Sequence, residues 1–292
     1  MRRFLMAVVT FGAVGTAQAA DMPDFLRGSV PADQTPTRNW DGWYAGGQVG
    51  YSAANIDFRK SLQGLTNFIF RDTVLEDPTS QLSALSRANP HTAGFGGFVG
   101  RNYQWDDLVF GVEANYSYLN GLAGSSTSSI GPLLFVNPKG ETPPPNTTDT
   151  YAVTLSGTAA VHIKDVITLR GRTGWATGNF LPYVFGGVAV GRMDVSRSVT
   201  SFVTKEQDVT TTNLGVTTTV FGPPVIIPSL TTTVGQERPN NFVVGWTGGL
   251  GMEYMLWNNV FMRGEWEYIR FLSVENTSVT MNTVRAGIGY KF

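Results

Sequence analysis

The chain has 292 residues, of which 21 are basic and 22 acidic, and its formal net charge of −1 gives no basic surface for nucleic acid. It contains no cysteine, which excludes disulfides, thiolate chemistry and cysteine-based metal sites. Only 15% of the residues are charged, and no apolar run in the mature part is long enough for a transmembrane helix. The abundance of glycine and aromatic residues favours strands and turns.

The N-terminus has the pattern of a secretory signal peptide. Arg2 and Arg3 precede an apolar stretch from Phe4 to Val14, and Ala17-Gln18-Ala19 fits the small-residue rule for cleavage. The apolar stretch is too short to serve as a membrane anchor. We therefore predict a signal peptide over residues 1–19, cleaved after Ala19.

The remaining chain divides by its periodicity. Residues 20–40 are proline-containing and show little alternation, so we expect a periplasmic lead-in without a fold of its own. In residues 41–292, eight segments alternate apolar and polar side chains with the period of a β-strand. These segments are approximately 43–53, 92–103, 108–119, 151–176, 181–195, 242–256, 260–269 and 283–292. The start of the fourth is uncertain, and both faces of the fifth are apolar, which leaves its orientation open.

The connections between these segments have two lengths. Three of them are only a few residues long, whereas the segments 55–91, 120–150 and 196–241 are long. Short turns on one side and long loops on the other, with an even strand number, are typical of outer-membrane barrels. Because lipid forbids open sheet edges, such a sheet must close. We therefore predict an all-β fold: a closed eight-stranded antiparallel transmembrane β-barrel with three short periplasmic turns and long extracellular loops, the fourth strand rising above the membrane.

Tryptophans fall at one level of this predicted barrel. Four of them lie at the predicted periplasmic strand ends, namely Trp43, Trp105, Trp175 and Trp257. Tryptophan favours the membrane interface, where its ring is buried and its N–H stays hydrated. We interpret the four as an interface girdle, and the alternative is four scattered core residues.

The polar faces of the strands carry eight charged residues that the alternation directs into the barrel. They are Glu113, Arg170, Arg172, Glu253, Arg263, Glu265, Glu267 and Arg285. An eight-stranded barrel is just wide enough for its own side chains, and four positive and four negative groups should pair there. We expect a salt-bridged, largely closed lumen, with a narrow or gated small-solute porin as the alternative.

Two of the long loops have patterns of their own. In residues 61–76, Leu62, Leu65, Phe68 and Ile69 fall on one helical face, which predicts a short helix over the barrel mouth or, alternatively, a loop without order. The third loop is threonine-rich over 210–220 and 230–234, and we expect these arms to extend the hairpin between the fifth and sixth strands.

The sequence offers little for catalysis. Histidine occurs only at His91, beside a proline at a loop end, and at His162, which alternation places on the inward face with Ser156 and Lys164. We find no acid–histidine–serine spacing, metal-ligand cluster or phosphate loop. We therefore predict no enzymatic activity, no cofactor and no metal.

Five stretches of the predicted strands share a recurrent pattern of glycine, aromatic and alternating apolar residues. They are N-W-D-G-W-Y-A-G-G-Q-V-G-Y from Asn39, F-G-V-E-A from Phe110, L-R-G-R-T-G from Leu169, L-P-Y-V-F-G-G from Leu181 and V-R-A-G-I-G-Y-K-F from Val284. Together, and in this order, they resemble the small alphaproteobacterial outer-membrane proteins of the porin-opacity type, within the OmpA-like eight-stranded barrels. The resemblance implies that Ile288, Tyr290 and Phe292 form a C-terminal signal read by the barrel-insertion machinery. The long loops depart from the family in length.

The resemblance also implies a location and a function. We expect a protein of the cell outer membrane, in contact with its lipid and lipopolysaccharide, that contributes to membrane integrity and is exposed on the cell surface. A surface protein that binds a haem-like or host molecule through its loops is the other alternative.

Overall fold

The computed structural model describes residues 38–80, 82 and 85–292. The predicted signal peptide and residues 20–37 of the predicted lead-in lie outside this part. Its strands are β1 (Gly42–Asp57), β2 (Arg87–Ala88), β3 (His91–Trp105), β4 (Leu108–Val136), β5 (Thr147–Trp175), β6 (Phe180–Asn213), β7 (Val216–Val220), β8 (Val225–Ile226), β9 (Thr232–Met255), β10 (Val260–Phe271) and β11 (Ser278–Lys291). Helices α1 (Gln63–Phe70) and α2 (Glu76–Thr79) and a 3-10 turn, η2 (Pro228–Leu230), complete the described elements. None of these helices has the length and hydropathy to cross a bilayer.

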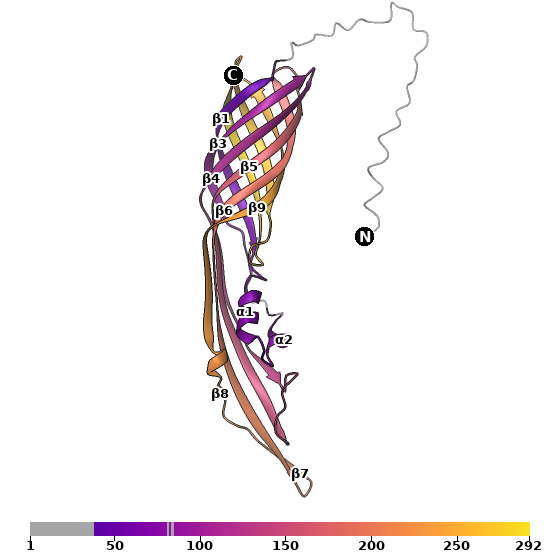
Figure 1. Cartoon of the computed structure of the whole chain (residues 1–292), viewed down its shortest axis with the longest axis vertical. Helices are drawn as coiled ribbons and strands as arrows, with labels where there is room; N and C mark the ends of the chain where they lie inside the picture. The colour runs from indigo at the N-terminus through magenta and orange to yellow at the C-terminus, as the bar shows by residue number, and fades with distance from the viewer. Residues whose placement is uncertain (1–37, 81, 83–84) are drawn as a thin grey trace, which may run out of the picture. The chain divides into compact units, whose positions relative to one another are not determined.

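The strands pair antiparallel in a ring (Figure 1). The order is β1, β3, β4, β5, β6, β9, β10 and β11, and β11 pairs back with β1 from Tyr44↔Lys291 to Asp57↔Ser278. The short strands β2, β7 and β8 add to β1 or β6 outside this ring. The predicted all-β antiparallel class is confirmed.

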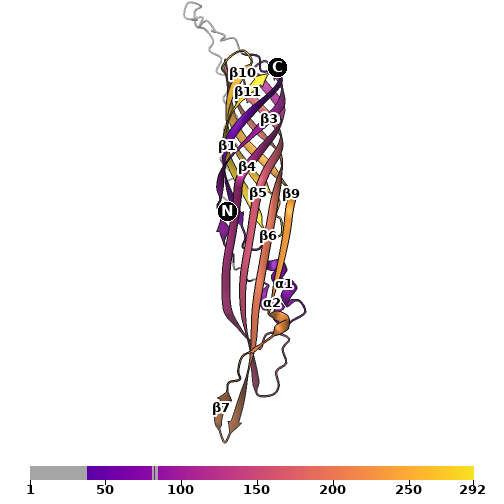
Figure 2. The ribbon, with the colours of Figure 1, turned by 90° about the vertical axis from the view of Figure 1, so that its left-hand side faces the viewer.

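Four strands continue far beyond the others, into two of the predicted long loops. Residues 120–136 and 147–150 extend β4 and β5, and the pairing of these strands continues to Val136↔Thr150. Likewise β6 runs on to Asn213, and β9 begins at Thr232. We call this part of β4, β5, β6 and β9 the extension (Figure 2). The loop expected over residues 120–150 is wrong because serine, threonine and glycine alternate with the apolar residues there, which lowers the hydropathy without breaking the strand period. The threonine-rich arms of the third loop were expected to extend the hairpin between the fifth and sixth strands, and Thr232 to Val234 do so by pairing with β6.

A β-bulge on β5 reverses which side chains face inward. The pairing of β5 with β6 shifts register between Ile163 and Asp165, so Lys164 is an extra residue. One added residue moves every following side chain to the opposite face. Val161 and Ile163 are therefore buried, whereas His162 and Lys164 are partly exposed on the outer face, as is Ser156. The predicted inward position of these three polar residues is wrong.

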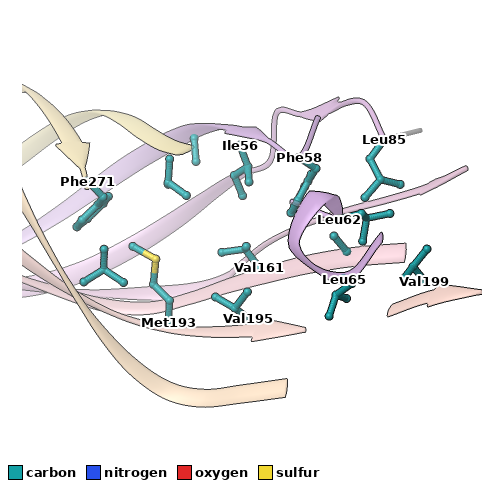
Figure 3. Packing of buried hydrophobic residues seen from close by; sticks show 14 of the residues in the cluster. Ile56, Phe58, Leu62, Leu65, Leu85, Val161, Met193, Val195, Val199 and Phe271 are labelled. Atoms are coloured by element: carbon teal, nitrogen blue, oxygen red, sulfur yellow. The ribbon is translucent and has the colours of Figure 1, made fainter. Parts of the chain in front are cut away.

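Helix α1 covers the inner face of the extension (Figure 3). Leu62, Leu65 and Ile69 are buried in one apolar cluster with β5 and β6, as the helical pattern predicted. Phe68 is the exception, since it is 60% exposed and Phe70 is buried instead. Burying one such aliphatic side chain stabilises the fold by about 2 kcal/mol. The predicted helix is present, and it gives the extension a core of its own.

Near the start of β5, a charged cluster ties the strands of the extension together. Lys205 Nζ lies 2.7 Å from Asp149 Oδ2 and 2.8 Å from Glu141 Oε1, and Gln207 donates to Asp149 Oδ1 at 2.9 Å. Burial disfavours the charged form of Asp149, but the hydrogen bonds from Lys205 and Gln207 outweigh it and lower the pKa of this carboxyl. Burial also opposes the charge of Lys205, and its acidic partners more than compensate, so its pKa is raised.

These pKa shifts predict the pH at which the charged cluster around Asp149 loosens. A carboxyl with a lowered pKa stabilises the fold above its unfolded pKa of about 3.9 and loses that contribution as the pH falls through the folded value. A lysine with a raised pKa contributes below its unfolded value and loses this only in alkali. We therefore expect faster hydrogen exchange over residues 147–153 below about pH 4, after correction for intrinsic rates. Asp149→Asn should abolish this acid dependence, and an unchanged dependence in the variant would refute it.

Candidate functional site

The interior of the ring is the candidate site, and it is filled by the side chains that the strand alternation directs inward. All eight charged residues predicted to face inward are buried there, on five strands of the ring. Each belongs to a strand in which glycine or polar residues occupy every second position and apolar residues occupy the positions between them, as in F-G-V-E-A around Glu113. The sequence pattern therefore brings the eight side chains into one space.

Glu113, on β4, lies at the centre of this network. Its Oε1 accepts a hydrogen bond from Arg170 Nη2 at 2.5 Å, and its Oε2 accepts from the Tyr44 hydroxyl and from Arg263 Nη2, both at 2.7 Å. Arg172 Nη1 makes a longer contact of 3.4 Å. Because β4 and β10 are not neighbours in the ring, the bond between Glu113 and Arg263 crosses the interior.

The other three carboxylates complete the pairing. Glu253 Oε1 accepts from Arg172 at 2.8 Å and from Arg263 at 2.9 Å. Glu265 lies 2.7 Å from Arg170 Nη2. The fourth carboxylate, Glu267, forms an ion pair with Arg285 and accepts from the Thr247 hydroxyl at 2.8 Å. Each of the eight charges thus has an opposite partner.

Aromatic rings support the guanidinium groups. The centre of the Arg170 guanidinium lies 4.1 Å from the Phe185 ring centroid, that of Arg172 3.9 Å from Tyr183, and that of Arg263 3.8 Å from Phe98. These rings were not predicted from the sequence. Two of them come from β6, whose orientation the alternation of its residues left open. A cation–π contact in a desolvated site contributes about 2 kcal/mol, so the rings offset part of the cost of burying the charges.

Between the network and the short turns, an apolar cluster closes the interior. It consists of Trp40, Tyr44, Phe98, Val109, Ala176, Leu181, Tyr183, Phe185, Met255 and Phe261. Trp40 precedes β1 and belongs to the predicted lead-in, yet it is only 1% exposed and packs edge-on against Phe261. Its backbone N–H donates to Gln104 Oε1 at 2.6 Å. Trp40 could have been found from the sequence, because it is an even number of residues from the inward-facing Tyr44 and so falls on the same face in an extended chain.

The residues beside Trp40 cross the same end of the ring. Arg38 Nε donates to Asn179 Oδ1 at 3.1 Å, and its Nη1 donates to Asn258 Oδ1 at 2.7 Å. Lys291 Nζ donates to the Asn39 carbonyl oxygen at 2.5 Å. The segment from Arg38 to Asp41 therefore joins two turns and the last strand, and we call it the strap.

On the other side of the network, toward the extension, the interior is apolar. The inward side chains at this level, on the ring strands and next to them, include Ala54, Ile56, Leu119, Leu122, Ala189, Met193, Val243, Ile269, Phe271, Val279 and Met281. They are continuous with the core of the extension that α1 covers. The interior is thus filled at three levels, by an aromatic cluster, a charge network and an apolar cluster.

The outer surface of the ring has the opposite character. Its exposed side chains are largely aliphatic and aromatic on every strand of the ring, among them Val49, Phe95, Tyr116, Leu169, Val184, Leu250, Met262 and Ile288. All four predicted girdle residues, Trp43, Trp105, Trp175 and Trp257, are exposed at the end with the short turns. The terminal residues Ile288, Tyr290 and Phe292 are exposed on the same surface. An apolar exterior around a charged interior is the inverse of a soluble fold.

The two histidines do not approach this interior. His91 stacks on Tyr51 on the outer surface, with ring centroids 5.7 Å apart. His162 Nδ1 lies 3.9 Å from Asp194 Oδ2 on the outer face of the extension. Within residues 38–80, 82 and 85–292, no group of three or more histidine, aspartate or glutamate side chains is arranged to hold a metal ion.

Comparison with known proteins assigns the chain. Residues 6–292 match the outer membrane protein beta-barrel domain family. The chain belongs to this family. It is 24% identical to the 31 kDa outer-membrane immunogenic protein of Brucella melitensis over 305 aligned positions that cover all of both chains. It is also 21% identical to the 25 kDa outer-membrane immunogenic protein of Brucella ovis, over 90% of this chain and 83% of that protein. Among solved structures, Neisserial surface protein A is similar at 14% identity and a TM-score of 0.33, covering 86% of this chain and 97% of that one.

Membership of the outer membrane protein beta-barrel domain family confirms the predicted location. The protein is an outer-membrane protein. The sheet itself separates the buried charges from the apolar exterior of the ring.

Proposed function

We propose that the protein is a structural component of the outer membrane: a closed eight-stranded transmembrane barrel that contributes to membrane integrity and carries the extension on the cell surface. In this arrangement the short turns, the strap and the C-terminus face the periplasm. The girdle tryptophans then mark the inner interface, where their N–H groups stay hydrated. The lipid and the lipopolysaccharide of the outer leaflet are the partners of the apolar exterior.

The observation that carries this proposal is the filled interior. Three levels of side chains occupy it, and the central level pairs its charges across the ring through Glu113 and Arg263. A solute could pass only if ion pairs in a water-poor interior separated, and removing one partner of such a pair costs about 3–5 kcal/mol. This supports a barrel without a steady pore over the porin alternative.

Planar-bilayer recording tests the closed lumen. We expect no stepwise conductance from the wild-type protein, while an open porin reconstituted in parallel conducts. Steady channels from the wild type, with a conductance that changes in Glu265→Gln or Arg172→Ala, would establish the porin alternative instead.

A gel run with and without boiling should show the mobility shift of a closed barrel. A deletion strain should also become more permeable to large hydrophobic antibiotics, and expression of the wild-type gene should restore the barrier.

The C-terminal residue gives a prediction about assembly. Phe292 is 73% exposed, so its side chain contributes little to the folded state. We expect Phe292→Ala to lower the amount of assembled protein in the outer membrane severalfold, because the insertion machinery reads this residue. Urea unfolding of the refolded variant in lipid vesicles should match the wild type. A variant that assembles normally in cells would remove the proposed assembly signal.

Ligand binding on the cell surface is the second candidate function. It is favoured by a hollow of about 390 Å³ on the extension, lined by residues that include His162, Asp194 and Arg238. An exposed imidazole is a group that haem iron accepts as a ligand. Titration with haemin tests this candidate: a Soret shift that His162→Ala removes would support it, and identical spectra for the two proteins would not.

A further inference from the structure

The tip of the extension is a two-stranded hairpin with a free edge. Residues 209–213 of β6 pair with β7 from Val209↔Val220 to Asn213↔Val216. Among the described residues β7 pairs only with β6, and all five of its residues are exposed. Its second edge therefore presents unpaired backbone N–H and C=O groups to the solvent (Figure 2).

This tip has none of the features that normally protect an edge strand. No charged residue occurs between Asp208 and Glu237, and no proline lies within β7. Natural edge strands carry charges, prolines or bulges that prevent pairing with another chain. Leu214, Phe221 and both valines of β7 are instead exposed. A partner for this edge has to be another strand, since a lipid surface cannot satisfy backbone groups.

The sequence of β7 identifies which strand fits. Val216-Thr217-Thr218-Thr219-Val220 reads the same in both directions. Antiparallel pairing of two copies about a two-fold axis at Thr218 therefore places valine opposite valine and threonine opposite threonine. The hairpin already contains this arrangement, because Thr211 pairs with Thr218 and Val209 with Val220. Its threonine hydroxyls also bond across the strands, at 3.2 Å between Thr210 and Thr219.

We propose that the β7 edge pairs antiparallel with the β7 edge of a second copy of this chain, joining two extensions through their tips. The interface is isologous, so the same strand serves both copies and the contact closes as a dimer. Cross-strand threonine and valine pairs stabilise such a ladder. The inference goes beyond the proposed structural function and stands on the hairpin alone.

Because the protein lacks cysteine, disulfide trapping tests the register. In the proposed dimer Thr218 lies opposite its own copy, at a Cα separation that a disulfide spans. We expect oxidised Thr218→Cys protein in lipid vesicles to form severalfold more disulfide-linked dimer than Thr211→Cys. The second variant is the matched control, since Thr211 lies on the same hairpin one strand further from the axis. Equal crosslinking of the two variants, or none with Thr218→Cys, would overturn the proposal.

A charge exchange tests the same pairing without cysteine. In the proposed register residue 217 of one copy faces residue 219 of the other. The double variant T217K/T219K then opposes like charges and should abolish dimers in light scattering, whereas T217K/T219E opposes unlike charges and should restore them. Within one hairpin both positions face neutral threonines, and the boiling shift of both variants reports that the barrel is folded. Dimerisation that is unchanged in T217K/T219K, or that stays lost in T217K/T219E, would contradict the inference.

Discussion

Glu113→Ala is expected to lower the free energy of unfolding by about 3–5 kcal/mol, which is the usual cost of removing one partner of a buried ion pair. The reason is the number of groups that depend on this carboxylate. It accepts hydrogen bonds from Tyr44, Arg170, Arg172 and Arg263, and it is fully buried. Its removal leaves three guanidinium groups with a net excess of positive charge in an interior that water reaches poorly.

Urea unfolding in lipid vesicles measures this change, with tryptophan fluorescence as the signal. Glu237→Ala is the matched control, because Glu237 is exposed on the extension and substitution of an exposed charge shifts stability by about 0.5 kcal/mol or less. An equal loss in the two variants would mean that the charge network does not hold the ring together. A variant that also conducts ions would in addition locate the barrier to solutes at Glu113.

The charge network was accessible from the sequence because two constraints agree there. The two-residue period fixes which side chains share a face, and lipid forces the charged face inward. Glu113, Arg170 and Glu265 could therefore be assigned one by one, without knowing the register between strands. Their actual partners could not be assigned, since Glu113 meets Arg263 across the ring and the period says nothing about distances between strands that are not neighbours.

The extension was harder to predict because the same constraint is weaker there. Along the extension the outer face is polar rather than apolar, so β4 and β6 lose there the hydropathy that marks their part of the ring. A single added residue, Lys164, then inverted the expected face of His162. Parity is reliable only between bulges, and a bulge inside a serine- and threonine-rich strand has no distinct sequence signal.

The strap yields the second large effect: Trp40→Ala is expected to destabilise the protein by about 3–5 kcal/mol, as truncation of a buried aromatic residue does. Trp40 fills the turn end of the ring against Phe261, and no other side chain of the strap enters this cluster. The cavity cannot collapse easily, because the surrounding strands are fixed by ring closure. Hydrogen exchange in the turn that contains Asn258 should accelerate as well, since Arg38 holds this turn from the same segment.

Two further variants distinguish the filling of the turn end of the ring by Trp40 from the simple loss of an aromatic residue. Trp43→Ala removes a tryptophan three residues away that points outward and is 55% exposed, and we expect it to cost clearly less stability. Trp40→Phe should retain most of the wild-type stability, because the indole N–H of Trp40 has no hydrogen-bond partner among the described residues, so phenylalanine loses only part of the packing. If Trp40→Ala and Trp43→Ala unfolded at the same urea concentration, the strap would not be part of the folded core, and the turn end of the ring would have to be closed by the ring's own side chains alone.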